Sequence, residues 1–177
     1  MMRQTFGGPV RPVIGPTDIR RCSASDRQAI WEIVNDAARA YRGVIADDCW
    51  KEPYMPLEEV QQEIAAGVVF HGYFEAERLA GVMGLQEKKD VTLIRHAYVR
   101  TARQRQGIGA ALLSQLRTTV NGPLLVGTWK AAHWAIRFYK RHGFRGVPPG
   151  EKDRLLIAYW SVPARQREES VVLRSDP

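Results

Sequence analysis

The residues best suited to chemistry lie in one glycine-containing stretch, YVRTARQRQGIGAALL, at residues 98–113. We expect a strand to end at Val99 and a helix with a regular apolar stripe to begin beside Gly107 and Gly109. Glycine lets backbone N–H groups approach a ligand closely, and the first turn of a helix offers unpaired N–H donors at the positive end of its dipole. The stretch therefore predicts an anion site suited to a phosphate group.

The same stretch carries three arginines within six residues: Arg100, Arg103 and Arg105. They favour a phosphate partner, although a solvated basic face and a simple tight turn at residues 107–109 stay open as interpretations. A Rossmann dinucleotide loop is excluded, because it needs G-x-G-x-x-G beside an early first strand. Here Leu112 takes the place of the third glycine, and the loop lies past the middle of the chain.

The elements that would position this loop are predicted from hydrophobic periodicity and turn residues. Helices are expected over residues 26–40, from Pro56 to a stop at Gly67, from the glycine loop to residue 121, and over 131–142 and 151–160. The first of these helices should start at an N-cap, Ser25, with Gln28 completing a capping box. Strands are expected at residues 19–22, 68–76, 79–87, 91–99, 124–129 and 169–175. This mixed order predicts an α/β protein with a central mixed sheet, as one domain over 18–177 behind a flexible lead-in over 1–17.

Composition narrows the class of protein further. The 177 residues suit one core, and the net charge of +7 favours anionic partners, although the basic residues are spread along the chain. Cys22 and Cys49 have no metal-ligand spacing, so free thiols and no metal site are expected. No apolar run approaches the roughly 20 residues of a membrane span, and no secretory signal is evident. We therefore expect a cytoplasmic protein without a membrane partner.

Two motifs resemble the GNAT superfamily of N-acetyltransferases. Residues Gln104 to Gly109 fit the pattern (Gln/Arg)-x-x-Gly-x-(Gly/Ala), and Ala135 to Phe144 fit Ala-x-x-Phe-Tyr-x-x-x-Gly-Phe, in the family's order and at its separation. The resemblance covers about residues 19–174. It departs from the family at Thr101, where proline is frequent, and at Ala132, where an asparagine often contacts pantetheine.

The resemblance implies a splayed mixed sheet flanked by helices, with acetyl-CoA bound as co-substrate between the fourth and fifth strands. Backbone N–H groups of two segments would then hold the co-substrate. By motif, Ala97, Tyr98 and Val99 would bind the pantetheine and the acetyl carbonyl. The pyrophosphate site would be formed by Gln104, Arg105, Gln106, Gly107, Ile108, Gly109 and Ala110. Tyr139 matches the tyrosine that protonates the leaving thiolate. It also belongs to an apolar helical stripe, so a core role stays open, but its position in the motif favours the role of general acid.

No general base is assigned. Leu93 stands where many relatives carry an acid, and it cannot accept a proton. His96 has a suitable side chain, but a structural role is the stronger interpretation. His133 and three carboxylates lack a supporting pattern: Glu52, Glu75 and Glu87.

The acceptor side is expected, by analogy with the family, in the loop from Tyr41 to Tyr54. It contains carboxylates and an aromatic side chain that would suit a cationic amine: Asp47, Asp48, Trp50 and Glu52. A solvated acidic loop explains the same residues. Two tryptophans lie near the second motif, Trp129 and Trp134. Packing is the more frequent role of tryptophan, but two at one place would also be suited to shape the same pocket.

The sequence thus predicts an N-acetyltransferase that acts on a primary amine of a small molecule or amino-acid-like acceptor. A CoA-binding module without turnover is the alternative, since no base is in view. A basic nucleic-acid-binding domain ranks below it, because no recognition motif accompanies the charge, and no nucleic-acid partner is expected. A homodimer that pairs the apolar C-terminal strand also stays open.

Overall fold

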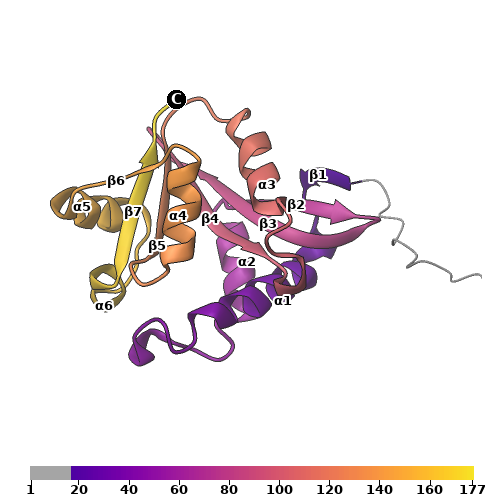
Figure 1. Cartoon of the computed structure of the whole chain (residues 1–177), viewed down its shortest axis with the longest axis horizontal. Helices are drawn as coiled ribbons and strands as arrows, with labels where there is room; N and C mark the ends of the chain where they lie inside the picture. Colours follow the sequence, from indigo (N-terminus) through magenta and orange to yellow (C-terminus); the bar gives the residue numbers. More distant parts are fainter. Residues whose placement is uncertain (1–16) are drawn as a thin grey trace, which may run out of the picture.

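The computed structural model describes residues 17–177, so nearly all of the predicted lead-in lies outside the described residues. A seven-stranded mixed sheet in the order β1-β2-β3-β4-β5-β7-β6 forms the centre of the molecule (Figure 1). Its strands are β1 (Thr17–Arg21), β2 (Val69–Glu75), β3 (Arg78–Glu87), β4 (Thr92–Val99), β5 (Leu124–Trp129), β6 (Arg145–Gly146) and β7 (Ser170–Ser175). All neighbours pair antiparallel except β4 and β5, which are parallel. The predicted α/β class and mixed sheet are confirmed.

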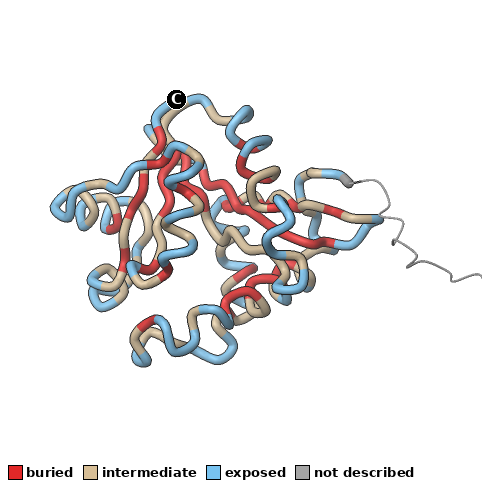
Figure 2. The backbone as a smooth tube through the Cα atoms, in the orientation of Figure 1, coloured by how far each residue is buried: buried red, intermediate tan, exposed pale blue. Residues whose placement is uncertain are grey.

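Six α-helices cover the sheet within the described part of the chain. They are α1 (Arg27–Ala38), α2 (Leu57–Ala65), α3 (Ile108–Arg117), α4 (His133–Arg141), α5 (Pro149–Tyr159) and α6 (Ala164–Glu168). On one face, α3 and α4 bury Leu112 and Tyr139 against Ile94 of β4. On the other face, α1 and α2 enclose a cluster with Phe70 of β2, and Leu156 of α5 packs on β4, β5 and β7. Figure 2 shows the buried residues following the strands, with the exposed residues on the outer sides of the helices.

The parallel joint between β4 and β5 is short. Only three residue pairs connect the strands, from Thr92 with Leu124 to Ile94 with Val126. Beyond Ile94, β5 continues beside β7, whereas β4 remains paired with β3 alone. The edge of β4 that faces β5 is therefore open over residues 95–99, as the predicted splay requires.

A β-bulge interrupts β4 at this point. The pair Gly84–Arg95 is followed by Val82–Tyr98, so β4 advances three residues where β3 advances two. The extra residue reverses the faces to which the following side chains point. Alternation from Leu93 predicts one face for Leu93, Ala97 and Val99, but Ala97 and Val99 pack with Ile94 instead.

Other boundaries also differ from the predictions. The capping box forms two residues earlier than predicted, where the backbone N–H of Ser23 donates to Asp26 Oδ2 at 2.7 Å. The helix α6 and the two-residue strand β6 were not predicted, because each is too short to show a period. The apolar strand β7 lies inside the sheet between β5 and β6, so most of its backbone is already paired.

Candidate active site

The predicted anion loop joins β4 to α3 beside the open edge of β4. The N–H of Gln104 donates to Thr101, and that of Ala111 donates to Gly107. Residues 105–110 lie between these two donors. Among the described residues, no turn or cap hydrogen bond engages their N–H groups. Gly107 has φ +85°, and Arg105 has φ +61°. The loop therefore presents a set of free N–H donors that fits a pyrophosphate.

Two of the three predicted phosphate-binding arginines have other partners. Arg103 pairs with Glu75, and Arg100 contacts Glu32 at 3.3 Å and donates to the Leu79 carbonyl at 2.9 Å. No ion pair holds Arg105 within the described part of the chain. Arg105 is thus the arginine of this loop that is available to an anion.

Tyr139 of α4 lies on the same face of the sheet as α3, buried in the main core. Its ring packs edge-on against Phe138 and Phe144, with centroids 5.1 and 5.3 Å apart. Burial, and secondarily the neighbouring Tyr41, raises the pKa of Tyr139 above its ordinary value. Among the described residues, its hydroxyl has no hydrogen-bond partner. The side chain thus keeps its proton at neutral pH and has that proton available.

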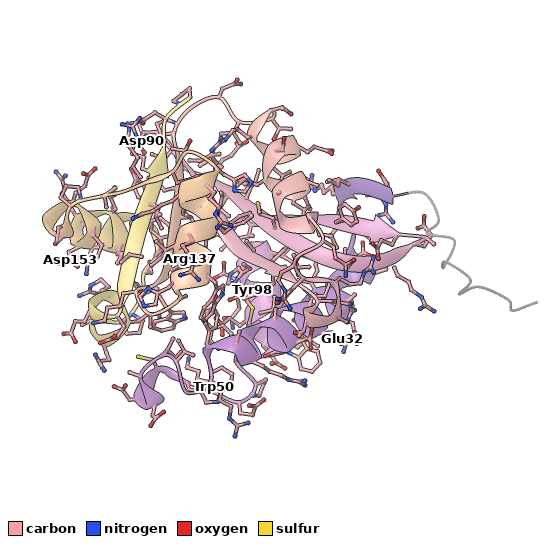
Figure 3. All side chains as sticks on the ribbon, viewed as in Figure 1. Glu32, Trp50, Asp90, Tyr98, Arg137 and Asp153 are labelled. Carbon is pink, nitrogen blue, oxygen red and sulfur yellow. The ribbon has the colours of Figure 1, made fainter. Side chains whose placement is uncertain are left out.

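A cavity of about 510 Å³ adjoins the open edge of β4 and is lined by both diverging strands. Its lining includes Ile94 to His96 and Tyr98 of β4, Gly127 to Trp129 of β5, and residues 160–163 after α5. Arg165 of α6 also lines the cavity, and its Nε lies 2.8 Å from Oδ2 of Asp48, so this pair ties α6 to the loop before α2. The same guanidinium contacts Glu169, just past the end of α6, at 2.7 Å. Figure 3 shows Tyr98 at the centre of the molecule, with Trp50 in the loop at its lower edge.

Only part of the loop predicted to bind the acceptor lines this cavity. Of the four residues predicted there, Asp48 lines the cavity, but it is engaged by Arg165. Asp47 and Glu52 are exposed and do not line it, and Trp50 packs in a small cluster with Ile45. Trp129 lines the cavity, whereas Trp134 does not line it but stacks on Tyr41, which does.

Aromatic side chains form one wall of the cavity. Tyr54 accepts a hydrogen bond from Trp129 Nε1 at 2.9 Å, and Tyr41 lies 5.5 Å from Tyr54 and 6.5 Å from Tyr98 between ring centroids. Burial raises the pKa of Tyr41, Tyr54 and Tyr98, most strongly for Tyr98. The wall is therefore uncharged and rich in π faces, which suits a cation.

Two further carboxylates reach the cavity from α2, Glu59 and Glu63. They are four residues apart and so lie on one side of the helix. Glu63 pairs with Arg95 and His96, whereas no ion pair engages Glu59 within the described residues. Sequence reasoning missed both, although two carboxylates four residues apart on a short helix are a visible signal.

Comparison with known proteins identifies the class. Residues 27–156 match the acetyltransferase (GNAT) domain family, so the chain belongs to the GNAT acetyltransferases and is an acyltransferase enzyme. The resemblance drawn from the two motifs is confirmed. Among curated proteins, none matches this chain.

Solved structures share the fold at low identity. A PaiA N-acetyltransferase from Thermoplasma acidophilum, in complex with coenzyme A, is 16% identical over 92% of this chain and 99% of its own, with a TM-score of 0.69. A GNAT family acetyltransferase from Elizabethkingia anophelis with acetyl-CoA bound is 16% identical over 91% and 98%, with a TM-score of 0.62. The ribosomal-protein-S18-alanine N-acetyltransferase from Escherichia coli is 15% identical over 91% and 94%, with a TM-score of 0.59. Within the part of the chain that the structure describes, no helix is long and apolar enough to cross a membrane.

Proposed function

We propose that this enzyme transfers the acetyl group of acetyl-CoA to a primary amine of a small molecule. The observation that supports this proposal is the divergence of β4 from β5, with free N–H donors beside it and a cavity lined by both strands. Acetyl-CoA supplies the activated thioester when bound. The solved structures with coenzyme A or acetyl-CoA support this choice of co-substrate.

In this proposal, acetyl-CoA binds on one face of the sheet and the acceptor binds on the other. N–H groups of Ala97 to Val99 orient the pantetheine and the acetyl carbonyl, and those of residues 105–110, in the motif begun by Gln104, bind the pyrophosphate. Tyr139 gives its proton to the sulfur that leaves. The acceptor enters the cavity on the opposite face, where α6 and the Arg165–Asp48 pair restrict its size.

The experiment that tests the proposal is thiol release from acetyl-CoA with a panel of amines, amino acids and peptides. Release with small primary amines, together with mass spectrometry of the N-acetylated product, is the expected result. Binding of acetyl-CoA without release on any acceptor would instead identify a module without turnover. Release only with peptides would overturn the small-molecule acceptor.

Gly107→Ala should raise the KM for acetyl-CoA, because φ of +85° is unfavourable for alanine by about 1–2 kcal/mol. No atom lies within 4 Å of the added Cβ, so the effect would come from the backbone alone. Gly67→Ala is the matched control, since Gly67 has φ +95° and equally open surroundings at the end of α2. Steady-state kinetics should give an increase of the KM for acetyl-CoA for Gly107→Ala alone. Equal KM values for both variants would show that the loop does not bind acetyl-CoA.

Glu59→Gln should raise the KM for a cationic acceptor by about 5- to 10-fold, as expected when a charged hydrogen bond worth about 1.5 kcal/mol is weakened. Glu59 lines the cavity beside the aromatic wall, whereas the adjacent Glu58 is exposed and does not. Glu58→Gln is therefore the control for the loss of one negative charge on α2. Equal acceptor KM values for the two variants would show that Glu59 does not contact the acceptor.

A further inference from the structure

Two consecutive residues of β4 point toward the same carboxylate. Arg95 Nη2 lies 2.8 Å from Glu63 Oε1, and His96 Nε2 lies 3.1 Å from Glu63 Oε2. Consecutive side chains of a regular strand point to opposite faces of the sheet. The bulge between Arg95 and Tyr98 removes that alternation, so it brings both side chains onto Glu63.

The carboxylate of Glu63 is fixed from several sides. Arg95 also donates from Nη1 to Gln86 Oε1 at 2.9 Å, and Gln86 Nε2 donates to the Ala66 carbonyl at 2.8 Å, just past the end of α2. Glu63 is only 18% exposed and Arg95 13%. Burial by itself would raise the pKa of Glu63, but contacts with His96 and Arg95 outweigh it and lower that pKa. Glu63 is therefore an ionised carboxylate at neutral pH, held in one orientation.

The contact between Glu63 and His96 is close but imperfectly aligned. The two atoms lie 3.1 Å apart, yet Glu63 Oε2 and His96 Nε2 are both buried without a well-aligned hydrogen bond. Buried polar atoms left in this way are exceptional in native structures, and a catalytic role is one of the explanations for them. The hydrogen bonds of catalytic bases are often poorly aligned before substrate binds. The geometry is thus that of a histidine and a carboxylate whose bond can tighten when the ring takes up a proton.

The backbone of His96 adds an independent observation. Its φ of +51° is in the left-handed region, which a non-glycine residue adopts at a cost of about 1–2 kcal/mol. Its ring stacks on Phe70, with centroids 5.9 Å apart. Strained residues persist where the surrounding structure holds them and are frequent at active sites. Here the strain places the imidazole in the cavity wall, one residue before Ala97.

We propose that His96 is the general base of the transfer and that Glu63 is its positioning residue; the inference rests on the proposed function. An ionised carboxylate can only accept, so Glu63 keeps the proton of a neutral imidazole on Nε2 and leaves the lone pair on Nδ1. His96 Nδ1 takes one proton from the acceptor amine as the new N–C bond forms. The C–S bond of the thioester breaks, and Tyr139 Oη gives its proton to the sulfur.

Charged groups from every neighbouring element set the surroundings of His96. Glu63 and Glu59 come from α2, and Arg95 comes from β4 itself. Lys51 and the Arg165–Asp48 pair lie along the same cavity. Of these, Glu63 is the group in direct contact with the imidazole.

The test compares Glu63→Gln with wild type over pH, using thiol release with the best amine. The plateau of the kcat/KM profile should fall by about 10-fold or more in Glu63→Gln, because the imidazole loses the carboxylate that fixes its orientation and its tautomer. His96→Asn should abolish the acidic limb of the profile and lower kcat by about 10²-fold, since asparagine tolerates positive φ and so keeps the bulge. Glu58→Gln, exposed on the same helix, should match wild type.

A second readout does not depend on turnover. Histidine ¹⁵N chemical shifts should report the Nε2–H tautomer for His96 in wild type and a mixture of tautomers in Glu63→Gln. If Glu63→Gln fails to fold, Glu63→Asp replaces it in both measurements. An unchanged pH profile with an unchanged tautomer, in an enzyme that turns over, would overturn this inference alone. Absence of thiol release from wild type with every amine would overturn the proposed function as well.

Discussion

Tyr139→Phe should lower kcat by about 10²-fold while leaving the affinity for acetyl-CoA nearly unchanged. Only the hydroxyl is removed, and general acids contribute about 10²- to 10⁴-fold to rate. The ring keeps its contacts with Phe138 and Phe144, and the hydroxyl has no partner among the described residues whose loss would destabilise the fold. Steady-state kinetics, with isothermal titration of coenzyme A, would measure both quantities.

The control for Tyr139 is Phe138→Leu, because Phe138 also packs in this core but carries no proton to donate. Thermal unfolding of both variants separates packing from chemistry. A wild-type kcat in Tyr139→Phe would assign Tyr139 to the core, which is the alternative that the apolar stripe of α4 leaves open. A loss of kcat together with a large loss of stability would lead to the same assignment.

Gly84→Ala should destabilise the fold by about 1–3 kcal/mol, the range found for overpacked cores. An added Cβ would lie 2.7 Å from Val68 Cγ1 and 2.9 Å from the carbonyl oxygen of Arg95. The side chain of Val68 can rotate, but the carbonyl belongs to the backbone of the bulge, so β4 itself must move. We therefore expect the activity at low temperature to fall as well, because the bulge positions His96 and the N–H of Ala97.

Gly146→Ala is the matched control for this substitution. Gly146 lies in β6 of the same sheet, and no atom is within 4 Å of its added Cβ. Urea denaturation should give wild-type stability for Gly146→Ala and a lower midpoint for Gly84→Ala. Equal midpoints would show that the bulge absorbs the extra methyl group without strain.

Most of the fold followed from local patterns in the sequence. The hairpin of β2 and β3, the strands β4, β5 and β7, and the helix α5 are each long enough to show a period or to end at a turn residue. The family motifs placed the anion loop and Tyr139 on elements that the structure contains. The predictions of these elements succeeded because the signal and the structure are both local, whereas the roles of the loop and of Tyr139 stay predictions.

The bulge in β4 was not predictable in the same way. It depends on the register between β3 and β4, which no pattern within β4 encodes, and alternation therefore assigned Ala97 and Val99 to the wrong face. The partners of Arg100 and Arg103 are also distant in sequence, at Glu32 and Glu75. Such pairings arise only when strands and helices have assembled.

The acceptor side shows the same limit. Asp48 was predicted to contact the acceptor, but it is paired with Arg165, 117 residues away in the chain. Glu63 belongs to no motif, and its contacts with Arg95 and His96 form across the helix–sheet interface. The small-molecule acceptor, the cytoplasmic location and the homodimer stay predictions.

The short joint between β4 and β5 has a mechanical consequence. Three residue pairs connect a four-stranded half of the sheet to a three-stranded half, and the strand order makes this joint the single seam between them. A ligand that bridges the open stretch would supply the hydrogen bonds that the missing strand contacts would otherwise make. Binding would thereby lock the two halves together, and the seam would be the place where opening motions of the empty enzyme concentrate.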